Sequence, residues 1–235
     1  MTTILITGAN KGLGYETARQ LIAAGHTVYL GCRDPQRGQD AAQRLNARLI
    51  QLDVTDDDSV SAAAHLVEEM GGLDVLVNNA GVEGRGDGNA IITAGEVTAA
   101  MMREVFDTNV FGQIRVTHAF LPLLQRSSAP VIVNVSSSLG SLSLAERPES
   151  PTFFYPGVAY PASKSAVNMI TVQFAKQFPT MRVSAVEPGY TDTDLNGHTG
   201  TQTVEEGARI IVEMAQTPGD GPTGGYFSAH GPVPW

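Results

Sequence analysis

The sequence predicts an α/β fold, in which a doubly wound parallel sheet of seven strands carries helices on both faces. Three observations predict this fold. Short apolar segments alternate along the chain with longer segments of helical periodicity. The apolar segments are continuous, as in strands that are buried on both faces of a parallel sheet. Parallel strands that alternate with helices are joined by right-handed crossovers, which place helices on both sides of the sheet.

A single domain accounts for the whole chain, residues 1–235. This length suffices for one domain with a sizeable buried core, and we find no internal repeat, low-complexity segment or linker. Hydrophobic residues make up 42% of the sequence and charged residues 17%. This composition is typical of a folded globular protein and argues against a disordered chain.

Charge and cysteine content narrow the function classes and the compartment. The net charge of −9 argues against a nucleic-acid-binding protein with a broad basic face. Cys32 is the single cysteine, so no intramolecular disulfide can form. The start "MTTILITGAN" lacks the basic and apolar parts of a signal peptide, and no apolar stretch approaches the roughly 18 residues of a membrane span. We therefore expect a cytoplasmic protein that binds neither nucleic acid nor membranes.

The first half of the chain contains four predicted strands and three predicted helices. Gly25 ends the first helix, and Asp34 and Pro35 mark the N-cap and first residue of the second. Thr55 is the expected N-cap of the third helix, because acidic residues of its first turn follow directly. The strands are expected at 3–7, 27–32, 47–53 and 73–81, and the helices at 13–24, 35–46 and 55–70.

The second half of the chain continues the alternation after a loop at 82–90 that is rich in glycine and charge. The Pro/Ser-rich stretch "AERPESPTFFYPG" at 145–157 predicts an inserted loop. The strands are expected at 130–138, 181–189 and 224–229, and the helices at 96–107, 109–125, 157–178 and 203–216.

A glycine-rich turn, "TGANKGLG" at 7–14, joins the first strand to the first helix. Its glycines Gly8, Gly12 and Gly14 have the spacing GxxxGxG, which differs from the common GxGxxG fingerprint. Glycines allow a tight turn and a close approach to a pyrophosphate, which the N–H groups and positive end of the following helix can hold. The alternative is an ordinary turn between strand and helix, but the position directly after the first strand favours a dinucleotide site.

The end of the second strand indicates which dinucleotide binds. An acidic residue there would accept hydrogen bonds from the adenosine 2′-hydroxyl, as NAD requires. This chain instead has Cys32 followed by Arg33, and Lys11 lies within the glycine turn. Two cations favour a 2′-phosphate, so we expect NADP(H). Asp34 is assigned to helix capping, and the alternative for Arg33 is a plain surface residue.

The stretch "AYPASK" at 159–164 places Tyr160 and Lys164 four positions apart, on one face of a helix. Taken alone, the pair is most simply a solvated helix face. The other reading is a proton donor that the lysine tunes. A free phenol has a pKa of about 10, and a neighbouring ammonium favours the phenolate, which would bring the phenol toward a pKa useful for acid–base catalysis.

Seven motifs occur in an order and at spacings that resemble the short-chain dehydrogenase/reductase family over essentially the full chain. The fragments "NKG" and "CRD" and the ending "GPTGGYFSAHGPVPW" are most similar to its carbonyl-reductase-like, NADPH-dependent branch. The resemblance implies a Rossmann fold and hydride transfer between NADPH and a ketone or aldehyde. The motifs are "TGANKGLG" at 7–14, "LDVT" at 52–55, "NNAG" at 78–81, "TNVFG" at 108–112, "NVSSSLG" at 134–140, "YPASK" at 160–164 and "EPGYTDT" at 187–193.

The resemblance implies a role for each matching residue. Tyr160 would be the general acid in carbonyl reduction and the general base in the reverse reaction. Lys164 would hold the nicotinamide ribose and lower the pKa of the phenol, and Asn109 would hold a water that links Lys164 to solvent. Tyr160 and Lys164 would also border the cofactor, and Asp53 would bind the adenine amine. The other cofactor positions that it implies are Gly8, Asn10, Lys11, Gly12, Leu13, Gly14, Arg33, Val54, Asn79, Ala80, Gly81, Pro188, Gly189, and Thr191 or Thr193 at the carboxamide.

Three consecutive serines compete for the role of the family's active-site serine, which would hydrogen-bond the substrate carbonyl. The family usually has a glycine three residues after that serine, so Gly140 favours Ser137 over Ser136 and Ser138. Ser137 and Tyr160 are further apart than is common in the family. We therefore expect residues 139–157 to form an inserted loop near the active site.

Two other functions stay open at this stage: an NAD-dependent alcohol dehydrogenase, and a dinucleotide-sensing protein without catalysis on the same fold. Phe153, Phe154 and Tyr155 in the inserted loop suggest an apolar or aromatic ketone as substrate. No metal site is expected, because the five histidines lack metal-ligand spacing. Family members are often dimers or tetramers, so a homo-oligomer is one alternative. The stretch "HGPVPW" at 230–235 either closes over the substrate site or packs beside it.

Overall fold

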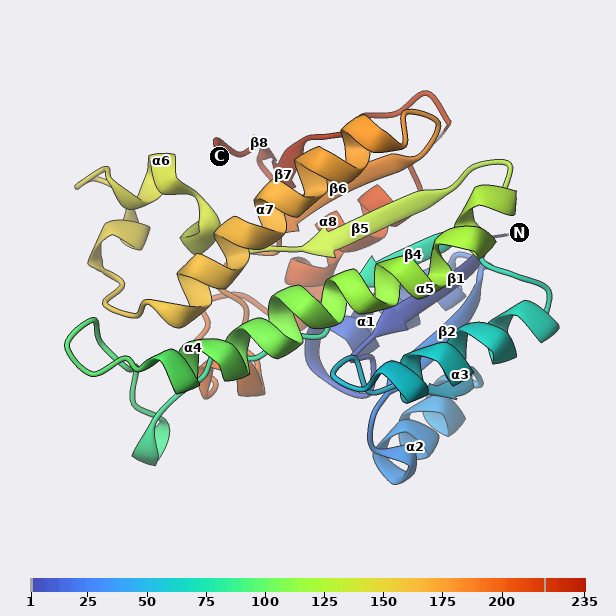
Figure 1. Cartoon of the computed structure of the whole chain (residues 1–235), viewed down its shortest axis with the longest axis horizontal. Helices are drawn as coiled ribbons and strands as arrows, with labels where there is room; N and C mark the ends of the chain where they lie inside the picture. The colour runs from blue at the N-terminus through green and yellow to red at the C-terminus, as the bar shows by residue number, and fades with distance from the viewer. Residues whose placement is uncertain (1, 218) are drawn as a thin grey trace.

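The computed structural model describes residues 2–217 and 219–235. The sheet runs in the order β3-β2-β1-β4-β5-β6-β7-β8 (Figure 1). The neighbouring strands from β3 to β7 are parallel, which confirms the predicted doubly wound α/β fold. An eighth strand, β8, pairs antiparallel with β7. The predicted count of seven missed it because β8 spans only Gly231–Pro232.

The strands agree with the predicted apolar segments, and β1 and β2 agree to the residue. The later strands end earlier than expected. The residues that follow their apolar segments lie beyond the paired strands and form the loops at the carboxyl end of the sheet. The strands are β1 Thr3–Thr7, β2 Thr27–Cys32, β3 Arg48–Gln51, β4 Val75–Asn78, β5 Val131–Val135, β6 Arg182–Glu187, β7 Tyr226–Ser228 and β8 Gly231–Pro232.

The helices also follow the predicted order, with one capping residue to correct. Asp34 caps α2 as predicted, accepting a hydrogen bond from the Arg37 amide. The expected cap Thr55 is wrong: Asp56 caps α3, because the Thr55 hydroxyl and amide both donate to Asp53 Oδ1, at 2.7 and 2.9 Å. The helices are α1 Gly12–Ala23, α2 Pro35–Leu45, α3 Asp57–Glu69, α4 Ala99–Phe106, α5 Gln113–Arg126, α6 Leu142–Ala145, α7 Ala159–Gln177 and α8 Val204–Ala215.

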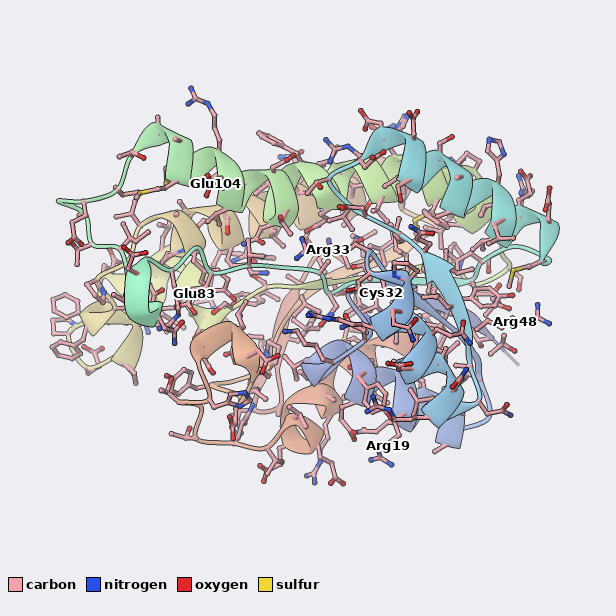
Figure 2. All side chains as sticks on the ribbon, turned by 90° about the horizontal axis from the view of Figure 1, so that it is seen from below. Arg19, Cys32, Arg33, Arg48, Glu83 and Glu104 are labelled. Carbon is pink, nitrogen blue, oxygen red and sulfur yellow. The ribbon has the colours of Figure 1, made fainter. Side chains whose placement is uncertain are left out.

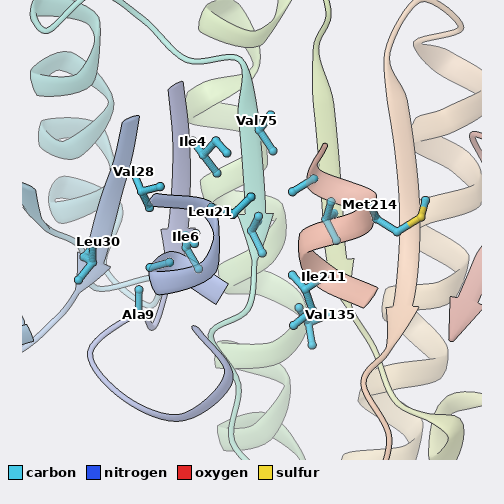
Figure 3. Packing of buried hydrophobic residues seen from close by; sticks show 14 of the residues in the cluster. Ile4, Ile6, Ala9, Leu21, Val28, Leu30, Val75, Val135, Ile211 and Met214 are labelled. Carbon is cyan, nitrogen blue, oxygen red and sulfur yellow. The ribbon is translucent and has the colours of Figure 1, made fainter. Parts of the chain in front are cut away.

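The helices form a layer on each face of the sheet. Helices α3, α5 and α7 lie in front of the sheet in Figure 1, and α1 and α8 lie behind it. Figure 3 shows the core on the α1 and α8 side, where Leu21 and Ile211 pack against strand residues such as Ile6 and Val135. A second cluster, with Phe120 at its centre, fills the opposite face. The apolar runs are continuous because both faces of the central strands are buried.

The predicted helices 96–107 and 109–125 are one continuous helical segment in the structure. A π-helical turn, Asp107–Gly112, joins α4 to α5. Such turns insert an extra residue into a helix and frequently occur at functional sites. A Cβ on Gly112 would lie 2.8 Å from Val54 Cγ2, so this glycine lets the turn pack against the loop after β3. The turn directs Asn109 inward, where only 2% of it is exposed.

Short helices also order the segment 139–157, which includes α6 and the 3-10 turn Pro151–Phe154. Other 3-10 turns are Asp87–Asn89, Ser138–Gly140 and Asp194–Asn196. Among residues 2–217 and 219–235, no helix is both long enough and apolar enough to span a bilayer.

Candidate active site

A cleft of about 1210 Å³ lies at the carboxyl ends of the parallel strands. This is where ligands bind in open α/β sheets, beside the point at which the strand order reverses. Here that point lies between β1 and β4. The cleft is lined by every predicted cofactor-binding residue: Gly8, Asn10, Lys11, Gly12, Leu13, Gly14, Arg33, Asp53, Val54, Asn79, Ala80, Gly81, Tyr160, Lys164, Pro188, Gly189, Thr191 and Thr193.

The glycine turn can only be built with glycine at two of its positions. Gly8 and Gly12 have φ angles of +66° and +55°, a left-handed conformation that glycine adopts without steric cost. A Cβ on Gly14 would lie 2.5 Å from Asn79 Nδ2, and one on Gly8 would lie 3.1 Å from Ala80 Cα. The turn therefore packs directly against the "NNAG" segment, and a side chain on Gly8 or Gly14 would collide with that segment.

Thr7 joins the same two segments through hydrogen bonds. Its hydroxyl accepts from the amides of Asn79 and Ala80, at 3.0 and 2.9 Å. Asn79 in turn donates from Nδ2 to the Thr7 carbonyl at 2.8 Å. Asn79 and Ala80 are thus structural supports of the cleft floor as well as part of its lining.

Arg33 and Asp53 lie near each other in the cleft. Arg33 follows β2 next to the buried Cys32 (Figure 2). Burial raises the pKa of Asp53, but hydrogen bonds from Thr55 and the charge of Arg33 outweigh it and hold that pKa below its ordinary value. Lys11 is exposed and pairs with Asp194 at 2.5 Å, and both also line the cleft. The predicted pair of cations is therefore one cation, Arg33, and one lysine that already has a carboxylate partner.

Tyr160 and Lys164 lie on the first turns of α7 and face the cleft. The Lys164 ammonium is 5.5 Å from the centre of the Tyr160 ring and donates a 2.7 Å hydrogen bond to the carbonyl of Val135, at the end of β5. Tyr160 is 9% exposed and Lys164 is 4% exposed. The pair is therefore not a solvated helix face, because a buried ammonium costs free energy that such a face would not require.

Burial dominates the electrostatics of this pair. It raises the pKa of Tyr160 above its ordinary value, the charges of Glu83 and Glu187 raise it further, and an interaction with the Ser137 hydroxyl lowers it. Burial lowers the pKa of Lys164 to about 8. Desolvation penalises the charged forms of both groups. The lowering of the phenol pKa by Lys164 stays a prediction.

The three consecutive serines have different surroundings. Ser136 is buried and donates to Asn168 Oδ1 at 2.6 Å. Ser137 lines the cleft, interacts with Tyr160, and caps the 3-10 turn Ser138–Gly140. Ser138 lies near Glu187, where burial raises the pKa of the carboxyl and Ser138 lowers it by a smaller amount. Of the three, Ser137 is the one whose hydroxyl lies beside the phenol.

Asn109 lies near Lys164, since both side chains are close to Gly81, but it does not line the cleft. Its amide donates to the Val82 carbonyl and to Ser163 Oγ, both at 2.9 Å, and its Oδ1 accepts from the Val82 amide at 2.8 Å. These bonds join the π-helical turn to the loop after β4 and to α7. Asn109 thus fixes the position of the first turns of α7, which carry Lys164, relative to the loop after β4.

The two threonines proposed for the carboxamide differ in their contacts. The Thr191 hydroxyl accepts from Gln202 Nε2 at 2.8 Å and donates to the Gly189 carbonyl at 3.2 Å. Thr193 faces the glycine turn, since a Cβ on Gly12 would lie 3.6 Å from Thr193 Cγ2. Both line the cleft.

Sequence reasoning did not single out two acidic residues of the cleft, Glu83 and Glu187. Both line it together with Tyr160 and with Tyr155 of the inserted loop. The signal for both acids was their position: Glu83 follows the "NNAG" motif after a single residue, and Glu187 directly precedes the Pro-Gly of "EPGYTDT". A carboxylate at the carboxyl end of a buried parallel strand lies beside the ligand cleft, because that cleft is formed by the carboxyl ends of the strands.

The segment "HGPVPW" packs beside the serine turn. The Pro234 carbonyl accepts from Ser141 Oγ at 2.6 Å, and the Trp235 carbonyl accepts from the Ser143 amide at 3.0 Å. The Trp235 ring stacks on Tyr226 with centroids 5.4 Å apart. Of the two alternatives for this segment, the structure supports packing, and the segment holds the chain that follows Ser137.

The titratable side chains form no metal site in residues 2–217 and 219–235: no three or more His, Cys, Asp or Glu side chains converge there. His198 is exposed and hydrogen-bonds Asp192 from Nδ1 and Asp194 from Nε2, at 2.8 and 2.7 Å. Its partners are thus two carboxylates of the loop that follows β6.

The cleft fits a dinucleotide on the strength of its shape and donors. The glycine turn lines the cleft and leads directly into the N-terminus of α1. Arg33 lines the same cleft. An anion at the turn would meet unpaired helix N–H groups.

Comparisons with known proteins agree with this site. A family model described as short chain dehydrogenase matches residues 2–204. The chain is 32% identical to (+)-neomenthol dehydrogenase of Capsicum annuum, with 95% of this chain and 94% of that protein covered. It is 35% identical to (−)-isopiperitenone reductase of Mentha piperita, with 95% of each chain covered.

Solved structures show the same relationship. An NADPH-bound carbonyl reductase from chicken fatty liver superposes with a TM-score of 0.86 at 29% identity, with 100% of this chain and 99% of that chain covered. Together with the cleft and its glycine turn, these matches show the family. The chain belongs to the short-chain dehydrogenase/reductase family, whose members are oxidoreductases that bind a nicotinamide dinucleotide.

Proposed function

We propose that the protein is an NADP(H)-dependent reductase of ketones or aldehydes that also oxidises the product alcohol in reverse. One observation carries the proposal: Ser137, Tyr160 and Lys164 line the same cleft as the glycine turn. The names of the similar proteins support it, since they include a neomenthol dehydrogenase, an isopiperitenone reductase and a carbonyl reductase.

Binding of the cofactor would use the glycine turn for the pyrophosphate and Arg33 for the 2′-phosphate. A guanidinium suits a phosphate because its N–H groups match two oxygens. Lys11 would contribute only if it exchanges Asp194 for the phosphate. When bound, NADPH supplies the hydride that the reaction requires.

The side chains of the protein would supply the proton and the hydrogen bonds that stabilise negative charge on the substrate oxygen. Tyr160 would donate its phenolic proton to the carbonyl oxygen of the substrate, and its raised pKa keeps that proton in place until negative charge develops on the oxygen. Ser137 would donate a hydrogen bond to the same oxygen. Lys164, with a pKa lowered to about 8, can take up and release protons near neutral pH behind Tyr160.

The substrate end of the cleft suggests an apolar ketone. Leu139, Phe154 and Pro156 line it beside the polar group of Glu83 and Tyr155. Apolar walls with a few convergent polar groups are typical of small-molecule sites. The cytoplasmic location and a dimer or tetramer stay predictions of the sequence.

The test is consumption of NADPH, followed by its absorbance, with a panel of cyclic, aromatic and aliphatic carbonyl compounds. Turnover with NADPH at a higher kcat/KM than with NADH supports the proposal. Turnover only with NADH would identify an NAD-dependent alcohol dehydrogenase. Cofactor binding without turnover of any compound would indicate a dinucleotide sensor.

A further inference from the structure

Three side chains from two loops meet beside Tyr160. Tyr155 donates from its hydroxyl to Glu83 Oε1 at 2.6 Å. Arg85 donates from Nε to Glu83 Oε2 at 2.9 Å and from Nη2 to Glu83 Oε1 at 3.0 Å. We call Glu83, Arg85 and Tyr155 the Glu83 cluster. Both oxygens of the carboxylate are engaged within it.

The Glu83 cluster is sheltered from solvent. The side chains of Glu83 and Arg85 are 8% and 16% exposed. Removing one member of such a pair leaves an uncompensated charge in a sheltered place, so the cluster acts as a unit. Arg85 also donates to the Asn89 carbonyl at 2.9 Å, which stiffens the loop after β4 that carries Glu83 (Figure 2).

Tyr155 joins this loop to the chain that enters α7. Tyr155 precedes the catalytic candidate Tyr160 by one short segment, which includes Gly157. Gly157 forms a β-bridge with Thr93, and a Cβ on it would lie 2.6 Å from the Tyr155 ring. The Tyr155 ring therefore packs against Gly157 and is held at its hydroxyl by Glu83, and it lines the cleft.

We propose that Glu83 is a positioning residue: through Tyr155 it holds the segment 151–157 against the loop after β4, and so shapes the wall that faces the carbonyl substrate. This inference rests on the proposed function. Pro151, Thr152 and Phe154 of that segment line the cleft, so loss of the clamp would loosen substrate contacts while leaving the cofactor end intact.

Two variants and a matched control test the inference. Tyr155→Phe removes only the hydroxyl that reaches Glu83, and Glu83→Gln removes the charge while keeping an acceptor. Glu68→Gln is the control, because Glu68 also accepts from an arginine, Arg126 at 2.7 Å, on helices α3 and α5. The measurements are kcat and KM for a carbonyl compound that the wild type reduces, the KM for NADPH, and chymotrypsin cleavage after Phe153 or Phe154.

The expected result is a KM for the carbonyl compound about tenfold higher in Tyr155→Phe, the size of one lost charge-assisted hydrogen bond, with kcat and the KM for NADPH close to wild type. Cleavage after Phe153 or Phe154, which are 45% and 73% exposed, should be faster in the same variant. Glu83→Gln should also raise the KM for the carbonyl compound, because it weakens the bond from the Tyr155 hydroxyl, and Glu68→Gln should change none of these values.

An unchanged KM and unchanged cleavage in Tyr155→Phe, or an unchanged KM in Glu83→Gln, would overturn the inference. Failure of the proposed function is distinguishable, because the wild type would then reduce no carbonyl compound. In that case the cleavage rates still decide whether Tyr155 and Glu83 clamp the segment.

Discussion

The Lys164 ammonium lies 5.5 Å from the centre of the Tyr160 ring, and both side chains are buried at the carboxyl edge of the sheet. The spacing of four residues on α7 sets this distance, and the hydrogen bond from Lys164 to Val135 fixes the ammonium under the end of β5. A buried ammonium that is satisfied by a backbone carbonyl, beside a phenol in a cleft, is an arrangement suited to proton transfer.

Arg33 should decide the choice between NADPH and NADH. Arg33→Asp replaces a phosphate-binding cation by a carboxylate that repels phosphate and accepts from a ribose hydroxyl. We expect kcat/KM for NADPH to fall about 30-fold relative to NADH, equivalent to about 2 kcal/mol of lost charge-assisted hydrogen bonding. Steady-state kinetics with both cofactors measure this.

Arg37→Asp is the matched control, because Arg37 is exposed on α2 and pairs with Asp34 at 3.4 Å. It makes the same charge change one helical turn away. An unchanged cofactor preference in Arg33→Asp, or an equal change in Arg37→Asp, would remove Arg33 from the cofactor site.

Substitution of Ser137 should mainly lower activity, whereas substitution of Ser136 should mainly lower stability. Ser137→Ala should lower kcat about a hundredfold, the usual effect of losing one donor to a developing oxyanion, and its cost in unfolding free energy should be limited to the loss of the capping bond that the Ser137 hydroxyl accepts from the Leu139 amide at 3.3 Å. Ser136→Ala removes the buried hydrogen bond to Asn168 and should cost about 1–2 kcal/mol of unfolding free energy with kcat close to wild type. Kinetics and urea unfolding of both variants give the comparison, and the opposite pattern would select Ser136.

Gly140 should couple the serine turn to Lys164. A Cβ on Gly140 would lie 2.7 Å from the Lys164 backbone carbon and 2.8 Å from its Cβ, so Gly140→Ala must push the turn away from α7. We expect the free energy of unfolding to fall by about 2 kcal/mol, as for overpacked cores, and kcat to fall with it. Gly95→Ala, where a Cβ would meet open space, should change neither value.

His198 should make stability depend on pH. Its hydrogen bonds to Asp192 and then Asp194 raise the pKa of His198 above the ordinary 6.5, so the folded state binds a proton more tightly than the unfolded state. The resulting stabilisation is fully present below pH 6.5 and is lost as the pH rises through the folded-state pKa. Urea unfolding of wild type and His198→Gln across this range should show a stability difference that shrinks with rising pH. A difference that is constant, or that grows with pH, would contradict it.

Much of the fold followed from the sequence because its signals are local. The continuous apolar runs placed β1 and β2 to the residue, and Asp34 capped α2 as expected. Thr55 was wrongly predicted as the N-cap of α3. Its hydroxyl donates to Asp53, so the neighbouring Asp56 caps the helix, and this side-chain hydrogen bond could not be foreseen from the sequence. The π-helical turn was missed because an inserted residue leaves the helical periodicity on each side intact.

The site was predictable where backbone geometry demands a residue type, as at Gly8 and Gly14. The pairing of Lys11 with Asp194 was not predictable, since it joins residues far apart in the chain. The same holds for the Glu83 cluster, which joins two loops. The pKa of Tyr160 could not be predicted either, because it depends on burial and on Glu83 and Glu187, which periodicity does not reveal.

The central claim is that the Tyr160 phenol gives its proton to the substrate carbonyl, and Tyr160→Phe tests it most directly. Tyr29→Phe, in the buried strand β2, is the control for loss of a phenolic hydroxyl outside the cleft. With a carbonyl compound that the wild type reduces, we predict that Tyr160→Phe lowers kcat by about a hundredfold or more while NADPH binding, followed by its fluorescence, is retained. Full reductase activity in Tyr160→Phe would contradict the account.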